Sequence, residues 1–434
     1  METNQQFLNA VYNAIGQRRD SYLELGMALA ASDHVASAVA LSESALYRRE
    51  FSSVYETLRE VKIDEAALLQ ANLAVLGDHC ETLDGYEVYS GDSTFIKRSH
   101  AATLPARTMK RLRTGELVYG HETYWTVRLA EQHTSWTVVA MVTRMANASV
   151  TAMAAQQMQH IDGYNDQAKL LVLDAGHGQA VLAGYQACCH TDIVMRLKSG
   201  QVFRHAPSAY QGRGRPRKHG ERFKLTADVP APNEQTTLTF KGRTLRVSAW
   251  HNLHYMHYSD IHGVILKLEF LNPDGTPLFN KPIWLFSTAK TAKPETLARA
   301  YLWRSAHELT FRFLKQHLGL TTCQSPNLTC CDNWYQLVAL AMNLLLSLKP
   351  QLTNTTPPWY PRARHKTVSQ RRAQKQALAF LLKVSTPTKP PQPAGKAPGR
   401  PMGYHPPPRT RHPVTRKSPK RRKACPTCPF KAAV

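Results

Sequence analysis

Three acidic residues have types and positions suited to holding divalent cations. Asp92 follows a β-type segment in the motif GDST, Asp174 ends a short apolar run in the motif LDAG, and Glu308 lies in a later helical segment. A carboxylate at the end of a buried strand costs desolvation free energy unless a partner such as a divalent cation neutralises it. Mg²⁺ is held by one or two carboxylates together with substrate phosphate oxygens. Two such ions, about 3.5–4 Å apart, can support an in-line phosphoryl displacement.

The segment around Glu308 carries further polar groups on one face. Tyr301, Arg304, Glu308 and Lys315 lie at positions i, i+3, i+7 and i+14. A helix with about 3.6 residues per turn brings these positions near one side. The alternative is a solvated face on which Arg304 and Glu308 form an i,i+4 ion pair worth about 0.3–0.5 kcal/mol. The spacing alone favours this alternative, and a strand-end Asp is likewise often only a turn cap.

The residues that position the first two acids have the pattern of a mixed α/β core. β-branched and aromatic residues predict strands, and apolar residues at helical spacing predict helices. The predicted order is three strands (residues 86–91, 123–131 and 134–144), a helix (149–161), a buried strand (169–174), a helix (179–189) and a strand (193–197). The continuous apolar run before Asp174 fits a strand that is buried on both faces.

Residues 200–292 interrupt this order. They begin with a Gly/Arg/Pro loop and continue with predicted strands at residues 236–240, 245–250, 264–271 and 283–287. Helices return at residues 294–318, where Pro294 suits a first-turn position, and at residues 333–348. The N-terminal residues 5–30, 36–60 and 64–77 also have helical spacing.

We therefore expect an α/β protein of five segments. The predicted segments are a helical N-terminal domain (1–80), the first part of the core with Asp92 and Asp174 (81–199), a β-rich insertion with a basic loop (200–292), a helical second part of the core with Glu308 (293–383) and a disordered basic tail (384–434). The tail is rich in Pro, Lys and Arg and has few large apolar residues, so it cannot bury a core of its own.

The positive charge is concentrated in two segments. The chain has a formal net charge of +24, yet residues 1–90 carry −8. Residues 196–224 carry +8, and residues 333–434 carry +20 without any acid. Lys and Arg that neutralise phosphates release counterions, so this distribution favours a nucleic-acid partner over a purely solubilising role. With no visible signal peptide or membrane-spanning run, we expect a cytoplasmic protein without membrane contact.

The polar stripe resembles the Y-x2-R-x3-E-x6-K signature of one large branch of insertion-sequence DDE transposases. Tyr301, Arg304, Glu308 and Lys315 match this signature at every spacing. The GDST around Asp92 resembles the first-acid motif of that branch, and the VLDAG that contains the second acid resembles the second. The order also fits, because a β-rich insertion lies between the second acid and the Glu.

The resemblance implies an RNase H-like catalytic core that cuts DNA with two metal ions. Asp92, Asp174 and Glu308 would hold two Mg²⁺ or Mn²⁺ ions, one of which would activate water to cut the strand at the element's end. The freed 3′-OH would then attack target DNA. Arg304 and Lys315 would contact phosphates near the cut, and the tyrosine of the signature would hydrogen-bond or stack beside it.

The resemblance also implies partners and a location. The partners are double-stranded DNA, as terminal inverted repeats and as target, and a second copy of the chain in a synaptic homodimer. The location is the bacterial cytoplasm, at the nucleoid. His177 follows the glycine after the second acid, and no chemical role is predicted for it.

The basic loop QGRGRPRKHG, at residues 211–220, has two interpretations, and the sequence supports both equally. Arg213, Arg215, Arg217 and Lys218 either enter an A·T-rich minor groove, as in an AT-hook-like motif, or contact phosphates without choosing a groove. The spacing of Cys425 and Cys428 is zinc-like, but a site from these two residues alone would be incomplete. Four histidines, at positions 251, 254, 257 and 262, do not match the period of a strand, so a shared metal site is not expected.

Two other functions remain open. One is a transposase-derived DNA-binding protein that no longer cuts, and the other is a different RNase H-like nuclease. The intact acids and the complete helix signature favour the enzyme over the first alternative. The large insertion and the Tyr/Arg/Lys stripe disfavour the second. Trp250 and Trp284 could stack on an unpaired base, but core packing is the commoner role of a strand Trp, and we expect it here.

Overall fold

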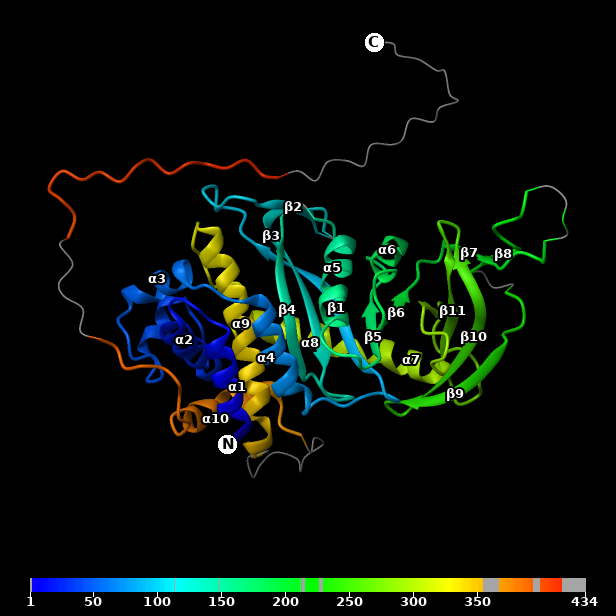
Figure 1. Ribbon diagram of the computed structural model, residues 1–434, viewed down its shortest axis with the longest axis horizontal. Helices are drawn as coiled ribbons and strands as arrows, with labels where there is room; N and C mark the ends of the chain where they lie inside the picture. Colours follow the sequence, from blue (N-terminus) through cyan, green and yellow to red (C-terminus); the bar gives the residue numbers. More distant parts are fainter. Residues whose placement is uncertain are drawn as a thin grey trace, which may run out of the picture.

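The computed structural model of the chain describes residues 2–112, 114–146, 148–210, 212, 215–225, 229–353, 367–392 and 399–415. A large mixed sheet runs through the molecule, with most helices at one end and the β-rich part at the other (Figure 1). The order of its strands is β2-β3-β1-β5-β6-β12-β11-β10-β7-β8, with β4 added to β3 and β9 added to β10. The expected mixed α/β class is therefore confirmed.

The core of the sheet is formed by strands that the sequence pattern predicts. Strand β1 (Glu87–Lys97) pairs with β3 (Leu117–Leu129) in antiparallel fashion and with β5 (Lys169–Leu173) in parallel. Strand β6 (Thr191–Arg196) continues the parallel pairing beyond β5, and β4 (Thr137–Met145) pairs with β3. All five residues of β5 are buried, as its apolar run predicts.

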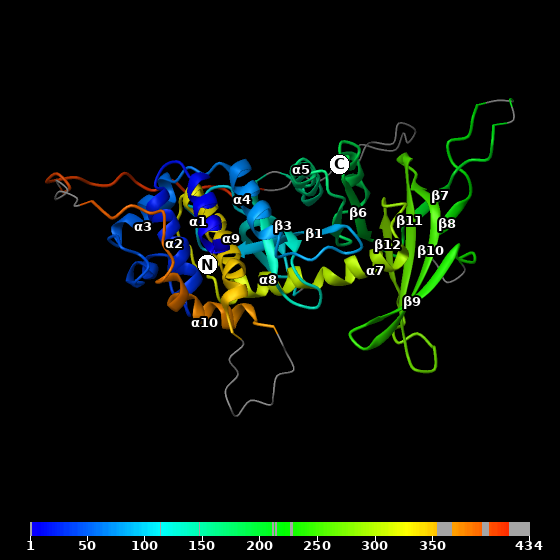
Figure 2. The same cartoon turned by 60° about the horizontal axis from the view of Figure 1, so that its bottom comes forward.

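Helices cover both faces of this core. Helix α5 (Val150–Asp162) and helix α8 (Ser305–Gln316) lie on opposite sides of β1 and β3 (Figure 2). The predicted helix at residues 179–189 is only a short turn, η2 (Gln179–Val181), followed by α6 (Leu182–Tyr185). Helix α9 (Leu328–Leu348) packs against β4 and is buried along most of its length, as its apolar run predicts.

The predicted helix at residues 294–318 is present in two parts. Helix α7 (Pro294–Trp303) and α8 meet at Arg304, whose backbone keeps right-handed helical angles of φ −49° and ψ −24°. The amide of Arg304 donates to the carbonyl of Tyr301, and the amide of His307 donates to the carbonyl of Arg304. These i to i+3 bonds tighten the helix at one residue without turning it away.

The N-terminal helices are shorter than predicted. They are α1 (Glu2–Asn13), α2 (Arg19–Ala31), the single turn η1 (Val39–Glu43), α3 (Ser52–Glu60) and α4 (Glu65–Gly77). The chain leaves the helix near Ile15, which bridges to Ile63. Between α2 and α3, serine side chains bond nearby backbone atoms, which competes with helix formation. Helices α1, α2 and α3 pack against α9, so they share one apolar core with it.

The insertion continues the core sheet and does not form a separate one. Strand β12 (Ile283–Ser287) pairs with β6 on one side and with β11 (Tyr258–Leu271) on the other. Beyond β11 lie β10 (Arg243–Tyr255), β9 (Glu234–Phe240), β7 (Val202–His205) and β8 (Arg222–Lys224). The rings of Trp250 and Trp284 are 5.6 Å apart in its core, and both side chains are buried. The expectation that they pack in the core is confirmed.

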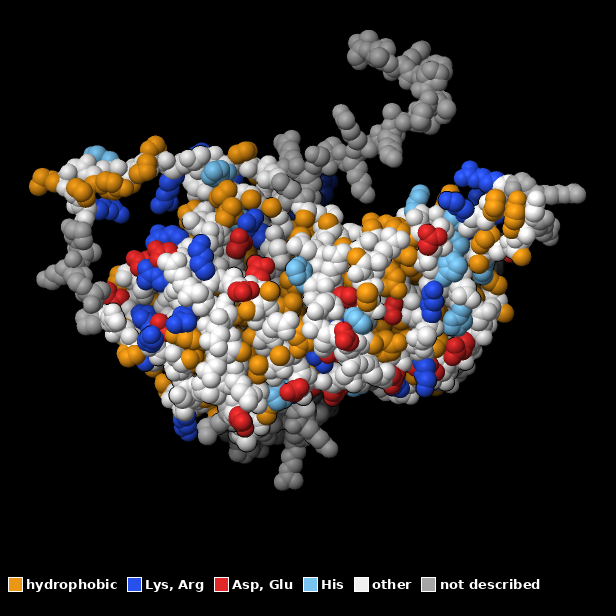
Figure 3. All heavy atoms as spheres, in the orientation of Figure 1, with side chains coloured by type: hydrophobic (Ala, Val, Ile, Leu, Met, Phe, Trp, Pro, Cys, Tyr) orange, Lys and Arg blue, Asp and Glu red, His pale blue; other side chains and the backbone are white. Residues whose placement is uncertain are grey.

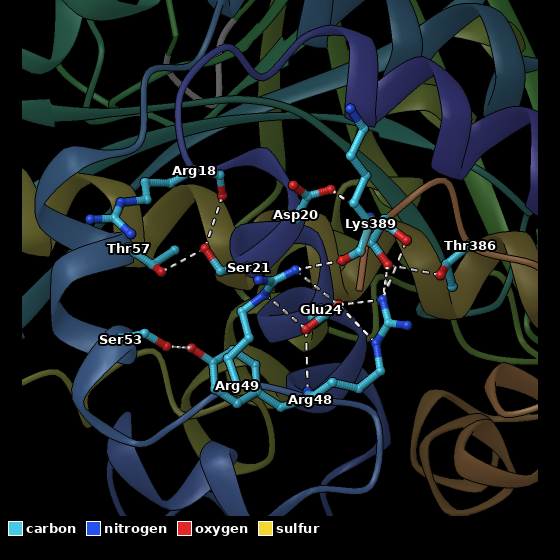
Figure 4. Close-up of polar contacts among 12 residues, drawn as sticks. Arg18, Asp20, Ser21, Glu24, Arg48, Arg49, Ser53, Thr57, Thr386 and Lys389 are labelled. Atoms are coloured by element: carbon cyan, nitrogen blue, oxygen red, sulfur yellow. Dashed lines mark hydrogen bonds and ion pairs between the residues drawn. The ribbon is translucent and has the colours of Figure 1, made fainter. Parts of the chain in front are cut away.

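The C-terminal segment is more ordered than predicted where the structure describes it. Helix α10 (Gln370–Leu381) packs against α2 and α9. Beyond it, the hydroxyl of Thr388 accepts a hydrogen bond of 2.6 Å from Arg48. Arg48 and Arg49 both pair with the buried carboxylate of Glu24, and the amide of Lys389 donates to Asp20 at 2.8 Å (Figure 4). The expectation of a disordered tail from residue 384 on is therefore wrong for residues 386–389, because hydrogen bonds from Arg48 and Arg49 and to Asp20 anchor them.

Candidate active site

Asp92 and Asp174 lie side by side on neighbouring strands. Gly91 of β1 and Leu173 of β5 are register partners in a parallel pair, and each acid is the next residue along its chain. The prediction that Asp92 follows the end of its strand is wrong, because β1 continues to Lys97 through the β-forming residues TFIK. Burial raises the pKa of Asp92, and the negative charge of Asp174 raises it further. The two carboxylates therefore repel each other in a partly buried place.

The carboxylate of Asp174 is held by two donors from the loop that follows it. Its Oδ1 atom lies 2.7 Å from Nδ1 of His177 and 2.9 Å from the amide nitrogen of Gly176. The hydrogen bond from His177 lowers the pKa of Asp174 to about 2, against the opposing effect of burial. Asp174 is thus a fixed, ionised acceptor at the C-terminal end of β5.

A buried hydrogen bond between His177 and Tyr124 supports Asp174, and the sequence pattern does not predict it. Nε2 of His177 lies 2.9 Å from the hydroxyl of Tyr124, which comes from β3. The hydroxyl of Tyr124 occupies the space above Gly91, where a Cβ atom would lie only 2.2 Å from it. The glycine of the first-acid motif therefore makes room for the group that supports the second acid. The order Asp-x-x-His in this loop is the only signal that the sequence offers for this contact.

Glu308 is connected to Asp92 through Arg304. One nitrogen of the Arg304 guanidinium lies 2.7 Å from Oε1 of Glu308, and another lies 3.5 Å from Oδ2 of Asp92. Burial opposes the charge of Arg304, but the nearby Tyr301, Glu308 and Asp92 outweigh burial and raise its pKa. The i,i+4 ion pair that the spacing predicts is therefore present, and it extends to an acid on β1.

The side chains of the three acids are not arranged as a metal-binding cluster. Among the residues that the structure describes, no three His, Cys, Asp or Glu side chains are arranged to hold one metal ion. The side chain of Glu308 is 61% exposed, whereas that of Arg304 is 12% exposed. A cationic guanidinium thus lies between carboxylates of the candidate site, and the more exposed glutamate has room to turn.

The other members of the stripe flank this site. Tyr301 is buried, and the guanidinium carbon of Arg304 lies 5.9 Å from its ring centre. Lys315 is exposed near the C-terminal end of α8, about two turns beyond Glu308. Loss of solvation and the positive charge of Lys110 lower the pKa of Lys315, while the charge of Asp92 opposes this shift. The charges of Lys110 and Asp92 are therefore both close enough to Lys315 to affect its pKa.

The basic loop lies in another part of the molecule. Arg215, Arg217 and Lys218 are exposed in the connection between β7 and β8, at the far end of the insertion. Figure 3 shows Lys and Arg side chains gathered at this end of the molecule. Arg213 lies outside the described residues, as do Cys425 and Cys428. No helix in the described part of the chain combines the length and apolar character that a membrane crossing requires.

The chain belongs to the DDE superfamily endonuclease family, whose model matches residues 10–255. The match contains Asp92 and Asp174 and ends before the helix that carries Glu308. Among solved structures, the chain is similar to the piggyBac transposase in a synaptic complex with hairpin DNA. That likeness has 10% sequence identity and a TM-score of 0.39, and it covers 85% of this chain and 73% of that one. A search of curated proteins finds no match.

Proposed function

We propose that this protein is a DNA transposase of the insertion-sequence type, which cuts and joins DNA at a site built from Asp92, Asp174 and Glu308. The observation that carries the proposal is the adjacency of Asp92 and Asp174 at a parallel strand pair, together with the ion-pair link from Asp92 to Glu308. Membership of a DDE endonuclease family supports the same chemistry.

The residues present fit a hard divalent cation. All three candidates offer carboxylate oxygens, which are the donors that Mg²⁺ and Mn²⁺ prefer. The mutual repulsion of Asp92 and Asp174 marks a place where a cation would be stabilised. Asp92 and Asp174 would hold the ions from the sheet, and Glu308 would complete the set by turning its exposed side chain away from Arg304. When bound, two such ions supply Lewis acidity at the scissile phosphate and stabilise the leaving oxygen.

The remaining residues of the site bind and orient the DNA. In the first step, water attacks the phosphorus and the bond to the 3′ oxygen breaks, which leaves a 3′-OH and a 5′-phosphate. In the second step, this 3′-OH attacks a phosphorus of the target strand and forms a new P–O bond, while the bond from that phosphorus to the target's 3′ oxygen breaks and leaves a 3′-OH on the target. Arg304, once released from Glu308, is placed to bind a phosphate oxygen through its planar fork. Lys315 adds a point charge beside it.

The test uses the three conservative variants Asp92→Asn, Asp174→Asn and Glu308→Gln, with Glu295→Gln on α7 as the matched control. The substrate is the DNA that flanks the reading frame. Each site variant is expected to lose Mg²⁺- or Mn²⁺-dependent cleavage and joining by at least about 1000-fold, because a ligand is lost. DNA binding in Ca²⁺ should stay within about twofold, and the control should cleave normally. Normal cleavage by any one variant removes that residue from the proposed site.

One observation favours a second candidate, a DNA-binding protein that no longer cuts. Arg304 already neutralises Asp92 and Glu308, so the acids have a partner without a metal ion. This candidate predicts that the unaltered protein binds the flanking DNA but cleaves it in neither Mg²⁺ nor Mn²⁺. Cleavage that depends on all three acids excludes it.

A further inference from the structure

The C-terminal segment returns to the edge of the core sheet, beside the candidate active site. Strand β2 (Thr108–Arg111) lies at one end of the strand order. Thr415 forms a parallel bridge with Thr108, and its amide donates to the carbonyl of Arg107 at 2.8 Å. The amide of His412 donates to the carbonyl of Ala102 at 3.0 Å. The tail is therefore held by backbone hydrogen bonds along an otherwise open sheet edge.

A basic hollow lies between this tail and the end of β1. It has a volume of about 490 Å³, and its wall includes Lys97, Ser99, His100 and Arg409. Arg98 also lines it but is committed to the fold, because its guanidinium donates to the carbonyls of Cys323, Gln324 and Ser325. Lys97 and His100 are exposed, and Arg409 comes from the tail itself. The tail thus contributes one cation, Arg409, to the wall of the hollow.

A chain of contacts connects β2 to the residue next to Asp92. Lys110 of β2 lies 4.0 Å from Oε1 of Glu122, and its ammonium group sits 5.6 Å from the ring centre of Phe95. The same carboxylate oxygen accepts a hydrogen bond of 3.3 Å from Ser93, the residue after Asp92. On the other side, Lys110 is near enough to Lys315 to influence its charge. Cations therefore continue from the candidate site along β2 to the tail.

This surface holds more positive charge than its acids neutralise. Its cations are the half-buried Lys110 and the exposed Lys97, Arg111, Lys315, Arg409 and Arg411. The acids among them are Glu116, which pairs with Lys97 at 3.0 Å, and the half-buried Glu122. Clustered cations of this kind raise the free energy of the protein alone and are stabilised by a polyanion.

We propose that β2, the loop before it and residues 409–415 form a phosphate-binding surface for duplex DNA, which extends from the candidate active site. The proposal rests on the proposed function for the identity of the DNA. It adds a path for the duplex that flanks the cut, and it makes the described part of the tail a component of that path. The cations are spread along a sheet edge, as contact with successive backbone phosphates requires, and they carry no sequence information of their own.

The test compares Lys110→Gln and Arg409→Gln with two matched controls. Lys241→Gln removes a lysine that also lies over a phenylalanine ring, at 5.3 Å, but at the tip of the β9–β10 hairpin. Arg400→Gln removes a tail arginine that lies 5.9 Å from the ring centre of Tyr404 and away from β2. Binding of a labelled 30-base-pair duplex is measured by fluorescence anisotropy in Ca²⁺, over a series of salt concentrations. This design records binding without cleavage.

Each surface variant is expected to weaken binding about three- to tenfold and to reduce the salt slope by about 0.9 per lost phosphate contact. The controls should stay within about twofold, with unchanged slopes. Thr415→Pro removes the amide that bonds Arg107 and should weaken binding as much as Arg409→Gln, because the tail leaves the edge. Circular dichroism confirms that each variant is folded.

The outcomes separate this inference from the proposed function. Glu295→Gln on α7 should bind the duplex like the unaltered protein, since this residue belongs neither to the surface nor to the site. If the surface variants lose affinity while the protein never cleaves, the inference stands and the proposed function fails. If cleavage is normal and the double variant of Lys110 and Arg409 keeps its salt slope, the inference is overturned. An equal loss in the controls also overturns it, because the effect would then come from net charge.

Discussion

Nδ1 of His177 lies 2.7 Å from Oδ1 of Asp174, and Nε2 of the same ring lies 2.9 Å from the hydroxyl of Tyr124. If Tyr124 donates to Nε2, then Nδ1 carries the proton and donates it to the carboxylate. The side chain is 0% exposed, and the backbone carbonyl of His177 accepts a further bond from the hydroxyl of Thr151. His177 therefore acts as a positioning residue for Asp174, held from three sides.

Replacing His177 should separate positioning from general stability. His177→Ala removes the donor, and we expect cleavage to fall about 10- to 100-fold, as for other residues that support a metal ligand. His177→Asn can place an amide N–H near the former Nδ1 position and should recover much of this loss. The measurement is the cleavage rate together with the Mn²⁺ concentration at half-maximal rate. Equal activity of the Ala and Asn variants would contradict the positioning role.

The hydroxyl of Tyr124 fills the space that a side chain at position 91 would need, so only glycine fits there. A Cβ atom there would lie 2.2 Å from that oxygen and 3.1 Å from Cδ2 of Leu173. Gly91→Ala is therefore expected to lower the free energy of unfolding by about 1–3 kcal/mol, as overpacked cores do. Adding Tyr124→Phe removes the clashing oxygen and should restore part of the loss. Urea denaturation measures both, with Gly200→Ala as the control because nothing lies within 4 Å of its Cβ position.

The sequence predicts the strands that hold the two aspartates, because β-branched and aromatic residues mark β1, β3, β4 and β5 strongly. It does not predict β2, whose residues TMKR have no apolar alternation and which depends on pairing with β3. The Tyr124–His177 contact joins residues that are 53 positions apart, so only the tertiary fold reveals it. The bridge from Arg304 to Asp92 is missed for the same reason, although spacing predicts its bond to Glu308. Local sequence patterns thus predict the helices and strands, whereas the candidate site depends on contacts between residues that are far apart in the chain.

Arg304 neutralises two of the candidate ligands, so it should compete with a cation for them. Arg304→Met removes this competitor, and we expect Mn²⁺ binding without DNA to become several-fold tighter, as measured by electron paramagnetic resonance. Cleavage should fall in the same variant, because the phosphate contact is lost. Arg299→Met, an exposed cation on α7, serves as the control and should change neither quantity. Weaker Mn²⁺ binding by Arg304→Met would show instead that Arg304 holds the acids in place.

The buried carboxylate of Glu24 anchors the start of the C-terminal segment. Its side chain is 2% exposed and lies 2.6 Å from Arg48 and 3.2 Å from Arg49. Arg49 also donates to the carbonyl of Lys389 at 2.8 Å. Glu24→Gln leaves two guanidinium groups without their counter-charge, and we expect a loss of about 1–3 kcal/mol in the free energy of unfolding, since water reaches the 42% exposed side chain of Arg48.

The same change should release the segment before the whole protein unfolds. Trypsin should then cut after Lys383 faster than in the unaltered chain, because the residues beyond it lose their anchor. Glu56→Gln is the matched control, since its pair with Arg18 is exposed and 3.7 Å long. Its effect should stay within about 1 kcal/mol. An unchanged rate of tryptic cleavage in Glu24→Gln would mean that other contacts hold the segment.

The buried imidazole of His307 should make the stability of the protein fall on the acid side. Burial lowers the pKa of His307 to about 3, and the positive charge of Arg304 adds to the effect. A histidine in the unfolded chain has a pKa of about 6.5. Between the two pKa values, the unfolded state therefore binds more protons than the folded state. The contribution of neutral His307 to the stability of the folded protein is thus fully present above about pH 6.5 and is lost as the pH falls toward about 3.

His307→Phe keeps a ring beside Phe311, whose centre is 4.5 Å away, but cannot bind a proton. Urea midpoints at pH 7.5, 6 and 5 should therefore fall less steeply in this variant, while the exposed His160→Gln keeps the original slope. Parallel curves for His307→Phe and the unaltered protein would assign the acid sensitivity to other groups.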